Sequence, residues 1–204
     1  MECCREHSCR KRGGWQWHWR RRKSAVPVKE EHGIKKIVLI GTPNVGKSML
    51  FHRLTGTYVT ISNYPGTTVE IFRGRGAFED QICEVIDTPG MYSLLPVTEE
   101  ERVTRALLFA EHPEVILHVI DAKNLEKMLH LTLQLLEAEL PVILVINMVD
   151  EAEELGIKID FARLQEDLGI PVVATAASKG WGIELLRKKI VEYIAKHGLR
   201  ERVV

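Results

Sequence analysis

The stretch Gly41-Thr42-Pro43-Asn44-Val45-Gly46-Lys47-Ser48 decides the fold of this chain. It fits the phosphate-binding pattern G-x-x-x-x-G-K-[ST], and it lies between an apolar run at Lys36–Ile40 and a helical pattern at Lys47–Leu54. In such a strand, loop and helix, consecutive backbone N–H groups can point at a β-phosphate at the helix N-terminus. Lys47 would reach the β and γ oxygens, and the Ser48 hydroxyl would bind Mg²⁺. The stretch therefore predicts a site for a nucleoside triphosphate.

Length and composition indicate one globular domain. The chain has 204 residues, of which 45% are hydrophobic, and this is enough for a hydrophobic core. It has no run close to the about 18 consecutive apolar residues of a membrane span, and its N-terminus lacks the apolar run of a secretory signal. Three of the four cysteines crowd into the first nine residues and Cys83 stands alone, which is no disulfide framework. We therefore expect a cytoplasmic protein in a reducing compartment.

Residues 1–33 are expected to form a basic tail, rich in cysteine and tryptophan, without stable structure. Residues 1–23 hold eight lysines and arginines against two glutamates. A disordered extension or a wrongly chosen start codon is the simplest interpretation. Two functional alternatives are a transition-metal site and contact with nucleic acid or an anionic membrane. The metal alternative depends on residues that lack the paired C-x₂-C spacing of strong zinc sites, namely Cys3, Cys4, His7, Cys9 and His18.

From residue 34 to residue 204, apolar runs alternate with helical patterns, and we expect a single domain there. The predicted strands are Lys36–Ile40, Val69–Arg75, Gln81–Asp87, Val115–Asp121, Val142–Asn147 and Val172–Ala174. The predicted helices are Lys47–Leu54, Glu99–Phe109, Glu126–Glu139, Phe161–Leu168 and Ile183–Lys196. This alternation predicts an α/β fold, with a mostly parallel, six-stranded sheet, helices on both faces and ligands at the carboxyl ends of the strands. The second and third strands are expected to form an antiparallel hairpin at one edge.

A second motif indicates which base is bound. Asn147-Met148-Val149-Asp150 follows a buried strand, and its aspartate can accept hydrogen bonds from guanine N1–H and N2–H₂, a pair that adenine does not offer. The pattern resembles the N-K-x-D signature of small GTPases, with Met148 in place of lysine, which could alter stacking on the base. Thr175-Ala176-Ala177 matches the weaker S-A-x loop of the same superfamily, in which the Ala177 N–H would face guanine O6.

Two further segments are candidates for the switches that sense the γ-phosphate. Asp87-Thr88-Pro89-Gly90 ends a predicted strand and resembles the D-x-x-G switch. There Asp87 would hold Mg²⁺ through water, and the Gly90 N–H would contact the γ-phosphate. The first switch is expected within Gly56–Glu70, where Thr67 or Thr68 offers a hydroxyl to Mg²⁺.

The catalytic apparatus is less obvious. Many GTPases place a glutamine directly after the D-x-x-G glycine to orient the attacking water, but here that position is Met91. Hydrolysis must then rely on backbone groups, an ion or a partner. Asn44 is a candidate K⁺ ligand, because a monovalent cation beside the phosphates can neutralise developing charge as an arginine finger does. The alternative is that the Asn44 side chain only bonds the loop backbone.

Taken together, the motifs predict that the chain binds GTP or GDP with Mg²⁺ and K⁺. Catalytic roles are expected of Asn44, Lys47, Gly90 and either Thr67 or Thr68. Metal contacts are expected of Ser48, Asp87 and the same threonine for Mg²⁺, and of Asn44 for K⁺. Nucleotide contacts are expected of this threonine and of Gly41, Asn44, Val45, Gly46, Lys47, Ser48, Met49, Asp87, Gly90, Asn147, Met148, Asp150, Ala176 and Ala177.

The residues of several motifs indicate one family within this superfamily. The segments Asn63–Glu70, Asp87–Leu94, Asp121–Glu126 and Asn147–Ala152 resemble the G domain of the ferrous iron transport protein B family, over about Ile34 to His197. In that family the second threonine of G-x-T-V-E senses the γ-phosphate and Mg²⁺, and it corresponds to Thr68. The family's phosphate-loop asparagine, associated with K⁺-stimulated hydrolysis, corresponds to Asn44.

The resemblance implies a slow, K⁺-stimulated GTPase that acts as the cytoplasmic switch of a ferrous iron uptake system. Members usually continue into a helical domain and a membrane permease for Fe²⁺, whereas this chain ends at Val204. We therefore expect a stand-alone regulator, a subunit of a split transporter or a fragment. Its expected partners are guanine nucleotide, a permease on a separate chain at the inner face of the plasma membrane, and further copies of itself. The family's usual G-N-P-N loop start reads Gly41-Thr42-Pro43-Asn44 here.

A rival interpretation is a GTPase that assists RNA or ribosome assembly, with the basic tail as its RNA contact. Only the tail favours it, while the switch segments favour iron uptake. Nucleic acid is therefore not the expected partner.

Overall fold

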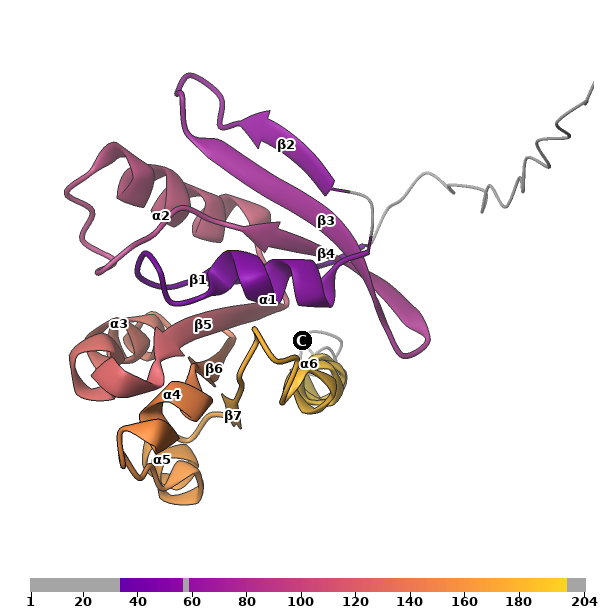
Figure 1. The fold of residues 1–204 in the computed structure, drawn as a ribbon. Helices are drawn as coiled ribbons and strands as arrows, with labels where there is room; N and C mark the ends of the chain where they lie inside the picture. The colour runs from indigo at the N-terminus through magenta and orange to yellow at the C-terminus, as the bar shows by residue number, and fades with distance from the viewer. Residues whose placement is uncertain (1–33, 57–58, 198–204) are drawn as a thin grey trace, which may run out of the picture. The chain divides into compact units, whose positions relative to one another are not determined.

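The described residues, 34–56 and 59–197 of the computed structural model, are built on one seven-stranded sheet (Figure 1). The expected tail at 1–33, with its metal and nucleic-acid alternatives, lies outside them. The strands are β1 (Lys35–Ile40), β2 (Val59–Asn63), β3 (Glu70–Phe78), β4 (Gln81–Asp87), β5 (Val115–Asp121), β6 (Val142–Asn147) and β7 (Val172–Ala174). The helices are α1 (Lys47–Leu54), α2 (Glu99–Glu111), the short 3₁₀ helix η1 (Ala122–Asn124), α3 (Leu125–Glu137), α4 (Val149–Glu154), α5 (Phe161–Leu168) and α6 (Ile183–His197).

The order of strands in the sheet brings the motifs to one edge. The strands lie in the order β2-β3-β4-β1-β5-β6-β7, and β1 is parallel to both of its neighbours, β4 and β5. The pairing continues in parallel through β5, β6 and β7. The phosphate loop follows β1. The D-x-x-G segment begins at the last residue of β4, and the base-reading motif begins at the last residue of β6. All three motifs therefore lie at the carboxyl edge of the sheet, where ligands bind in open α/β folds.

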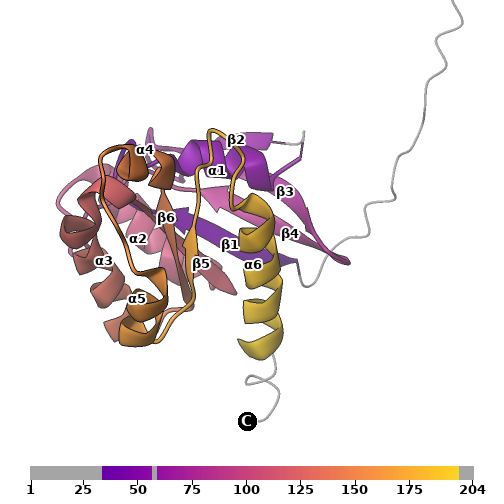
Figure 2. The same cartoon turned by 60° about the horizontal axis from the view of Figure 1, so that its bottom comes forward.

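Burial on both faces explains why β5 and β6 do not alternate apolar and polar residues along their length. Every residue of β5 and β6 is buried, because helices cover both faces of these strands. Apolar side chains of α1 and α6 share one core cluster with the sheet, and those of α2 and α3 share another. A third cluster packs α4 and α5 against β5, β6 and β7. Figure 2 shows α6 on one side of the central strands and α3 and α5 on the other. The predicted α/β architecture with a mostly parallel sheet is confirmed.

The sheet differs from the prediction at one edge. Six strands were expected, and the structure has a seventh, β2, within the segment expected to be the first switch. The predicted antiparallel pairing of β3 with β4 is confirmed, but β2 pairs with β3 and takes the edge position. All residues of β2 are exposed, although Val59-Thr60-Ile61-Ser62 alternates apolar and polar residues, a strand signal that the sequence analysis did not use. None of the helices within the described residues is long and apolar enough to cross a membrane.

Candidate nucleotide-binding site

Two glycines let the phosphate loop pack tightly against the sheet. Gly41 and Gly46 have φ values of 148° and 89°, which favour glycine. A Cβ atom on Gly41 would lie 2.1 Å from the Val119 carbonyl oxygen, and one on Gly46 would lie 2.3 Å from Asn147 Nδ2. Gly46 is also the residue directly before α1. The loop therefore needs glycine at both ends, as the motif predicts, and it lies against the strand that leads into the base-reading motif.

Lys47 lies folded over the loop that precedes it. Its Nζ donates to the carbonyl oxygens of Gly41 (3.1 Å) and Thr42 (2.9 Å), and the residue is 8% exposed. Burial lowers the pKa of Lys47, while the negative charge of Asp87 acts in the opposite direction. An ammonium group held between loop carbonyls is positioned to meet phosphate oxygens cradled by the same loop.

Ser48 and Asp87 meet at the start of α1. The Ser48 hydroxyl donates to Asp87 Oδ2 at 2.9 Å. The other carboxylate oxygen, Oδ1, is buried and has no hydrogen-bond partner among the described residues. Burial raises the pKa of Asp87, against the hydrogen bond from Ser48 and the charge of Lys47. A hydroxyl beside an unpaired carboxylate oxygen is a hard-oxygen set, so these residues fit Mg²⁺.

The D-x-x-G turn packs directly on the phosphate loop. A Cβ atom on Gly90 would lie 2.6 Å from Pro43 Cγ, and the Met91 N–H donates to the Gly41 carbonyl at 3.1 Å. The Met91 side chain is completely buried in the core beside α2. The position at which many GTPases have a water-orienting glutamine is therefore part of the hydrophobic core, and it does not face the site.

A buried glutamate, which the sequence analysis did not single out, binds the segment that follows this turn. Glu101 is 5% exposed, and its carboxylate accepts the N–H groups of Tyr92 (3.0 Å), Val97 (2.8 Å) and Thr98 (3.3 Å). The Val97 N–H is the main reason that the pKa of Glu101 lies below its usual value, with burial opposing it. The signal was present in the sequence, because Thr98 and Glu101 form the T-x-x-E capping box of α2.

The first switch segment distinguishes its two threonines. The Thr67 hydroxyl donates to the Tyr64 carbonyl (3.0 Å) and accepts the Val69 N–H (3.2 Å), so it is used within a turn. Thr68 is exposed, and among the described residues its hydroxyl has no hydrogen bond to Ser48 or Asp87. The structure thus leaves Thr68, rather than Thr67, available to a ligand.

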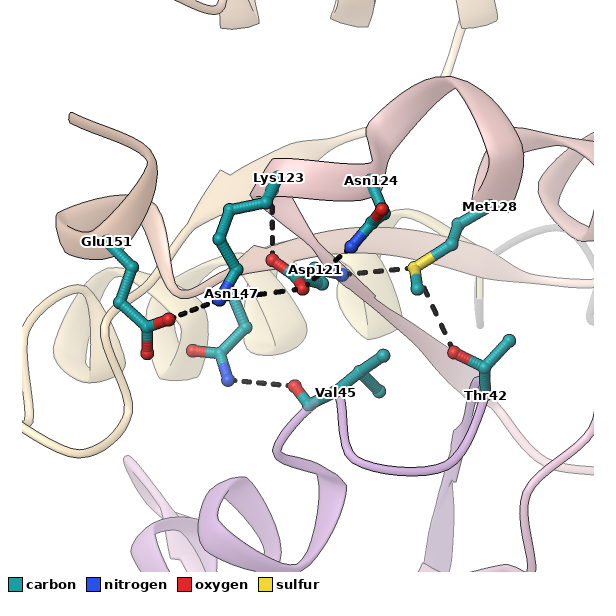
Figure 3. Close-up of polar contacts among 8 residues, drawn as sticks. All are labelled: Thr42, Val45, Asp121, Lys123, Asn124, Met128, Asn147 and Glu151. Carbon is teal, nitrogen blue, oxygen red and sulfur yellow. Dashed lines mark hydrogen bonds and ion pairs between the residues drawn. The ribbon is translucent and has the colours of Figure 1, made fainter. Parts of the chain in front are cut away.

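Asn147 connects the base-reading motif to the phosphate loop. It is 2% exposed, and its Nδ2 donates to the Val45 carbonyl at 3.0 Å (Figure 3). Its Oδ1 accepts the Thr175 hydroxyl and the Ala177 N–H, both at 3.0 Å. The sequence analysis expected the Ala177 N–H to face guanine O6, and that contact with the base stays a prediction. The buried amide oxygen of Asn147 takes this N–H, because it requires donors.

Asp150 and Met148 flank the place expected for the base. Asp150 forms an ion pair with Lys179 (2.9 Å), and this hydrogen bond holds the pKa of Asp150 below its usual value, against the effect of burial. Met148 has a left-handed backbone with φ 60°, and its Cε lies 3.8 Å from the place that a Cβ on Gly46 would occupy. The methionine therefore lies against the phosphate loop.

The turn after β5 supports the same region (Figure 3). Asp121 accepts the Lys123 N–H (2.9 Å) and an Asn124 side-chain N–H (3.1 Å). Lys123 also contacts Glu151 of α4, and Met128 Sδ lies near the Thr42 hydroxyl. These contacts tie η1 and α3 to the helix that carries Asp150 and to the phosphate loop.

The phosphate loop, the D-x-x-G turn, the base-reading motif and the loop of Ala176 and Ala177 thus come together at one edge of the sheet. Among the described residues, Thr68 of the first switch segment makes no hydrogen bond to them. Asn44 is exposed on the phosphate loop with φ 65°.

Comparison with known proteins gives the family. A sequence-family model described as ferrous iron transport protein B matches residues 35–190. The chain belongs to this family.

Two curated relatives match most of this chain. An Fe(2+) transport protein A/Fe(2+) transporter FeoB fusion protein from Porphyromonas gingivalis is 42% identical over 159 residues, which are 78% of this chain and 19% of that protein. The Fe(2+) transporter FeoB of Escherichia coli K12 is 38% identical over 167 residues, which are 80% of this chain and 22% of that protein. The chain therefore spans about a fifth of the length of these curated relatives.

Solved structures match over the G domain. The G domain of the T. maritima FeoB iron transporter has a TM-score of 0.73 and 42% identity, and the match covers 79% of this chain and 99% of that one. The cytosolic domain of the same transporter in a GMPPNP form has a TM-score of 0.73 and 41% identity, over 79% of this chain and 64% of that one. The fold is that of a FeoB G domain, a P-loop GTPase fold.

Proposed function

We propose that this chain binds GTP with Mg²⁺ and hydrolyses it to GDP and phosphate. The observation that carries the proposal is the meeting of Ser48 and Asp87 at the start of α1, with Asp87 Oδ1 lacking a hydrogen-bond partner among the described residues. Related FeoB cytosolic domains have been solved in GDP and GMPPNP forms, which supports guanine nucleotides as the ligands. The proposal is thus specific in both base and metal.

Each part of the site has a role in this proposal. The backbone of Gly41 and of Val45–Met49 cradles the phosphates, with Lys47 on the β and γ oxygens. Ser48, Asp87 and Thr68 supply oxygens for Mg²⁺, which when bound would neutralise charge on the β- and γ-phosphates. The Gly90 N–H would contact the γ-phosphate and so report its presence.

The base is read from the other side of the site. Asp150 would accept the guanine N1–H and N2–H₂, while Asn147 holds the base-reading motif to the phosphate loop. Met148 would pack on the base, and Ala176 and Ala177 would line it through the loop that holds Asn147. An adenine base would leave the Asp150 carboxylate facing an acceptor, which is unfavourable.

Turnover is proposed to be slow and stimulated by K⁺. The buried Met91 cannot orient water, so the position at which many GTPases have a glutamine gives no assistance to the attack. Asn44 is exposed on the phosphate loop, where its amide oxygen would hold K⁺ beside the phosphates. Positive charge at this place would stabilise the transition state as an arginine finger does.

We further propose that the domain is the cytoplasmic switch of a ferrous iron uptake system. Its switch segments would contact an Fe²⁺ permease at the inner face of the plasma membrane, and hydrolysis would reset them. The named function of the curated relatives, which are several times longer, supports this proposal. The proposal also includes association between copies of this chain. The alternative, an RNA- or ribosome-associated GTPase, depends on a tail that lies outside the described residues.

The test is phosphate release from GTP and from ATP by the purified chain, in KCl and in NaCl, with the variant Asn44→Ala. We expect release from GTP alone, raised by K⁺ and no longer raised in the variant. Arg102→Ala on α2, whose side chain is exposed, is the matched control and should behave as the wild type. Equal release from ATP would contradict the proposed base, and turnover that ignores the cation would contradict the role of Asn44.

A further inference from the structure

Arg53 connects the helix of the phosphate loop to the loop 175–181. It lies in the last turn of α1, and its Nε donates to the Ala177 carbonyl at 3.0 Å while its Nη2 donates to the Ser178 carbonyl at 2.8 Å. The planar guanidinium presents two separate donor nitrogens in a fixed geometry, whereas lysine has a single donor nitrogen on a flexible chain. Two adjacent carbonyls of one loop are therefore held by one side chain from a distant element.

The loop itself is a closed turn. Ala176 and Trp181 exchange backbone hydrogen bonds of 3.1 and 3.2 Å, and the Gly180 N–H donates to the Ala177 carbonyl at 3.2 Å. Gly180 has φ 74°, and a Cβ atom there would lie 3.6 Å from Arg53 Nη1. The guanidinium thus packs against the turn, and the Ala177 carbonyl accepts both a loop N–H and the Arg53 side chain.

This loop positions two side chains of the base-reading motif, Asn147 and Asp150. The Thr175 hydroxyl and the Ala177 N–H donate to Asn147 Oδ1, each at 3.0 Å. Lys179 forms the ion pair with Asp150 at 2.9 Å. A displacement of the loop would therefore disturb the Asn147 amide and the Asp150 carboxylate together.

The end of α1 is itself anchored. Arg187 of α6 donates from Nη2 to the carbonyls of Arg53 (2.6 Å) and Leu54 (3.2 Å), and from Nη1 to the Ala77 carbonyl (2.7 Å). Its guanidinium also lies 5.3 Å from the centre of the Phe78 ring. A cation on the last carbonyls of a helix is favourable, so the turn that presents Arg53 is fixed from outside.

We propose that Arg53 is a positioning residue for guanine recognition, which clamps the loop 175–181 to α1 and thereby slows release of guanine nucleotide. This inference rests on the proposed function, because it assumes that Asp150 reads guanine and that Asn147 holds the base-reading motif in place. Arg53 touches neither the base nor the phosphates in this account. It acts through the loop that orders these two side chains.

The first test needs no nucleotide. Amide hydrogen exchange of the ligand-free protein is followed in a peptide covering residues 175–181, in the wild type, Arg53→Ala, Arg53→Lys and the control Arg102→Ala. Loss of two hydrogen bonds to the loop should speed its exchange about tenfold in Arg53→Ala. Arg53→Lys should lie between, since lysine has a single donor nitrogen in place of the two separate nitrogens, Nε and Nη2, that Arg53 uses. Exchange unchanged from the wild type in Arg53→Ala would overturn the clamp.

The second test measures the consequence. Release of a fluorescent GDP analogue should be about fivefold to tenfold faster in Arg53→Ala, with partial rescue in Arg53→Lys and no change in Arg102→Ala. The preference for GDP over inosine diphosphate should also fall, because hypoxanthine lacks the amino group that a well-placed Asp150 binds. Equal weakening of both nucleotides, or unchanged release, would overturn the positioning role. A wild type that binds neither nucleotide would overturn the proposed function itself, while the exchange experiment still decides the clamp.

Discussion

Replacing Asn147 by alanine should destabilise the protein and loosen its nucleotide together. The side chain is 2% exposed and takes part in three hydrogen bonds, with Val45, Thr175 and Ala177. These bonds join the phosphate loop, β6 and the loop 175–181. Removing the amide would therefore separate the half of the site that binds phosphate from the half that reads the base.

The magnitude follows from what the substitution leaves behind. The Ala177 N–H loses its acceptor and the Val45 carbonyl loses its donor, in a place where water has little access. The Thr175 hydroxyl can turn to the Ile146 carbonyl, which lies 3.5 Å away, so its loss is smaller. Since a buried unsatisfied group costs about 1–3 kcal/mol, the free energy of unfolding should fall by about 2–4 kcal/mol.

Urea unfolding of the ligand-free protein measures this loss, and release of a fluorescent GDP analogue measures the functional one. Asn124→Ala is the matched control, because its side chain is exposed and makes a single bond to Asp121. It should change the unfolding free energy by less than about 0.5 kcal/mol. If Asn147→Ala were as mild as Asn124→Ala, the bridging role of Asn147 would be refuted.

Three further substitutions probe other parts of the site. Burial raises the pKa of Asp87, so its charge opposes folding at pH values above that raised pKa. Asp87→Asn should therefore stabilise the ligand-free protein where the carboxylate is charged, while abolishing Mg²⁺-dependent GTP binding. Thermal unfolding and calorimetry measure the two effects, and a less stable variant would contradict the first. Glu101 has a pKa below its ordinary value, so it stabilises the fold above the unfolded pKa of about 4.3, and this stabilisation is lost as the pH falls through the lower folded pKa. Glu101→Gln should lower the free energy of unfolding by about 1–2 kcal/mol at pH 7 and weaken its fall at acid pH, as urea unfolding at several pH values measures. An unaltered pH profile would count against this role. Gly41→Ala should prevent native folding, seen as loss of the cooperative thermal transition, because its Cβ would lie 2.1 Å from the Val119 carbonyl oxygen; a folded variant with wild-type stability would show that the loop can move.

The sequence predicted the features that depend on local pattern. The phosphate-loop glycines, Lys47 and Ser48 form one contiguous motif, and their context of strand and helix was visible in hydrophobic periodicity. The alternation of strands and helices then places every motif that follows a parallel strand at the same edge of the sheet. This is why the convergence of Asp87, Asn147 and the phosphate loop could be predicted before any coordinates.

Most features that escaped prediction depend on contacts between distant segments. The strand β2 was missed although Val59-Thr60-Ile61-Ser62 alternates apolar and polar residues, because its segment was assigned to the first switch. The hydrogen bond from the Ala177 N–H to the buried Oδ1 of Asn147, thirty residues earlier, was not predicted. Arg53 looks like an ordinary helix-surface arginine until the fold brings the loop 175–181 beside it. Such roles are set by which groups need partners once the chain is packed, and no local pattern records them.

Equilibrium binding of GDP and of ADP to the ligand-free protein, measured by calorimetry with Mg²⁺, tests the central claim most directly. The account predicts that GDP binds at least about 100-fold more tightly than ADP, because Asp150 pairs with two guanine donors that adenine lacks. It also predicts that Asp150→Ala removes most of this preference. Comparable affinities for GDP and ADP in the wild type, or a preference that survives in Asp150→Ala, would contradict the assignment of this edge of the sheet as a guanine-nucleotide site.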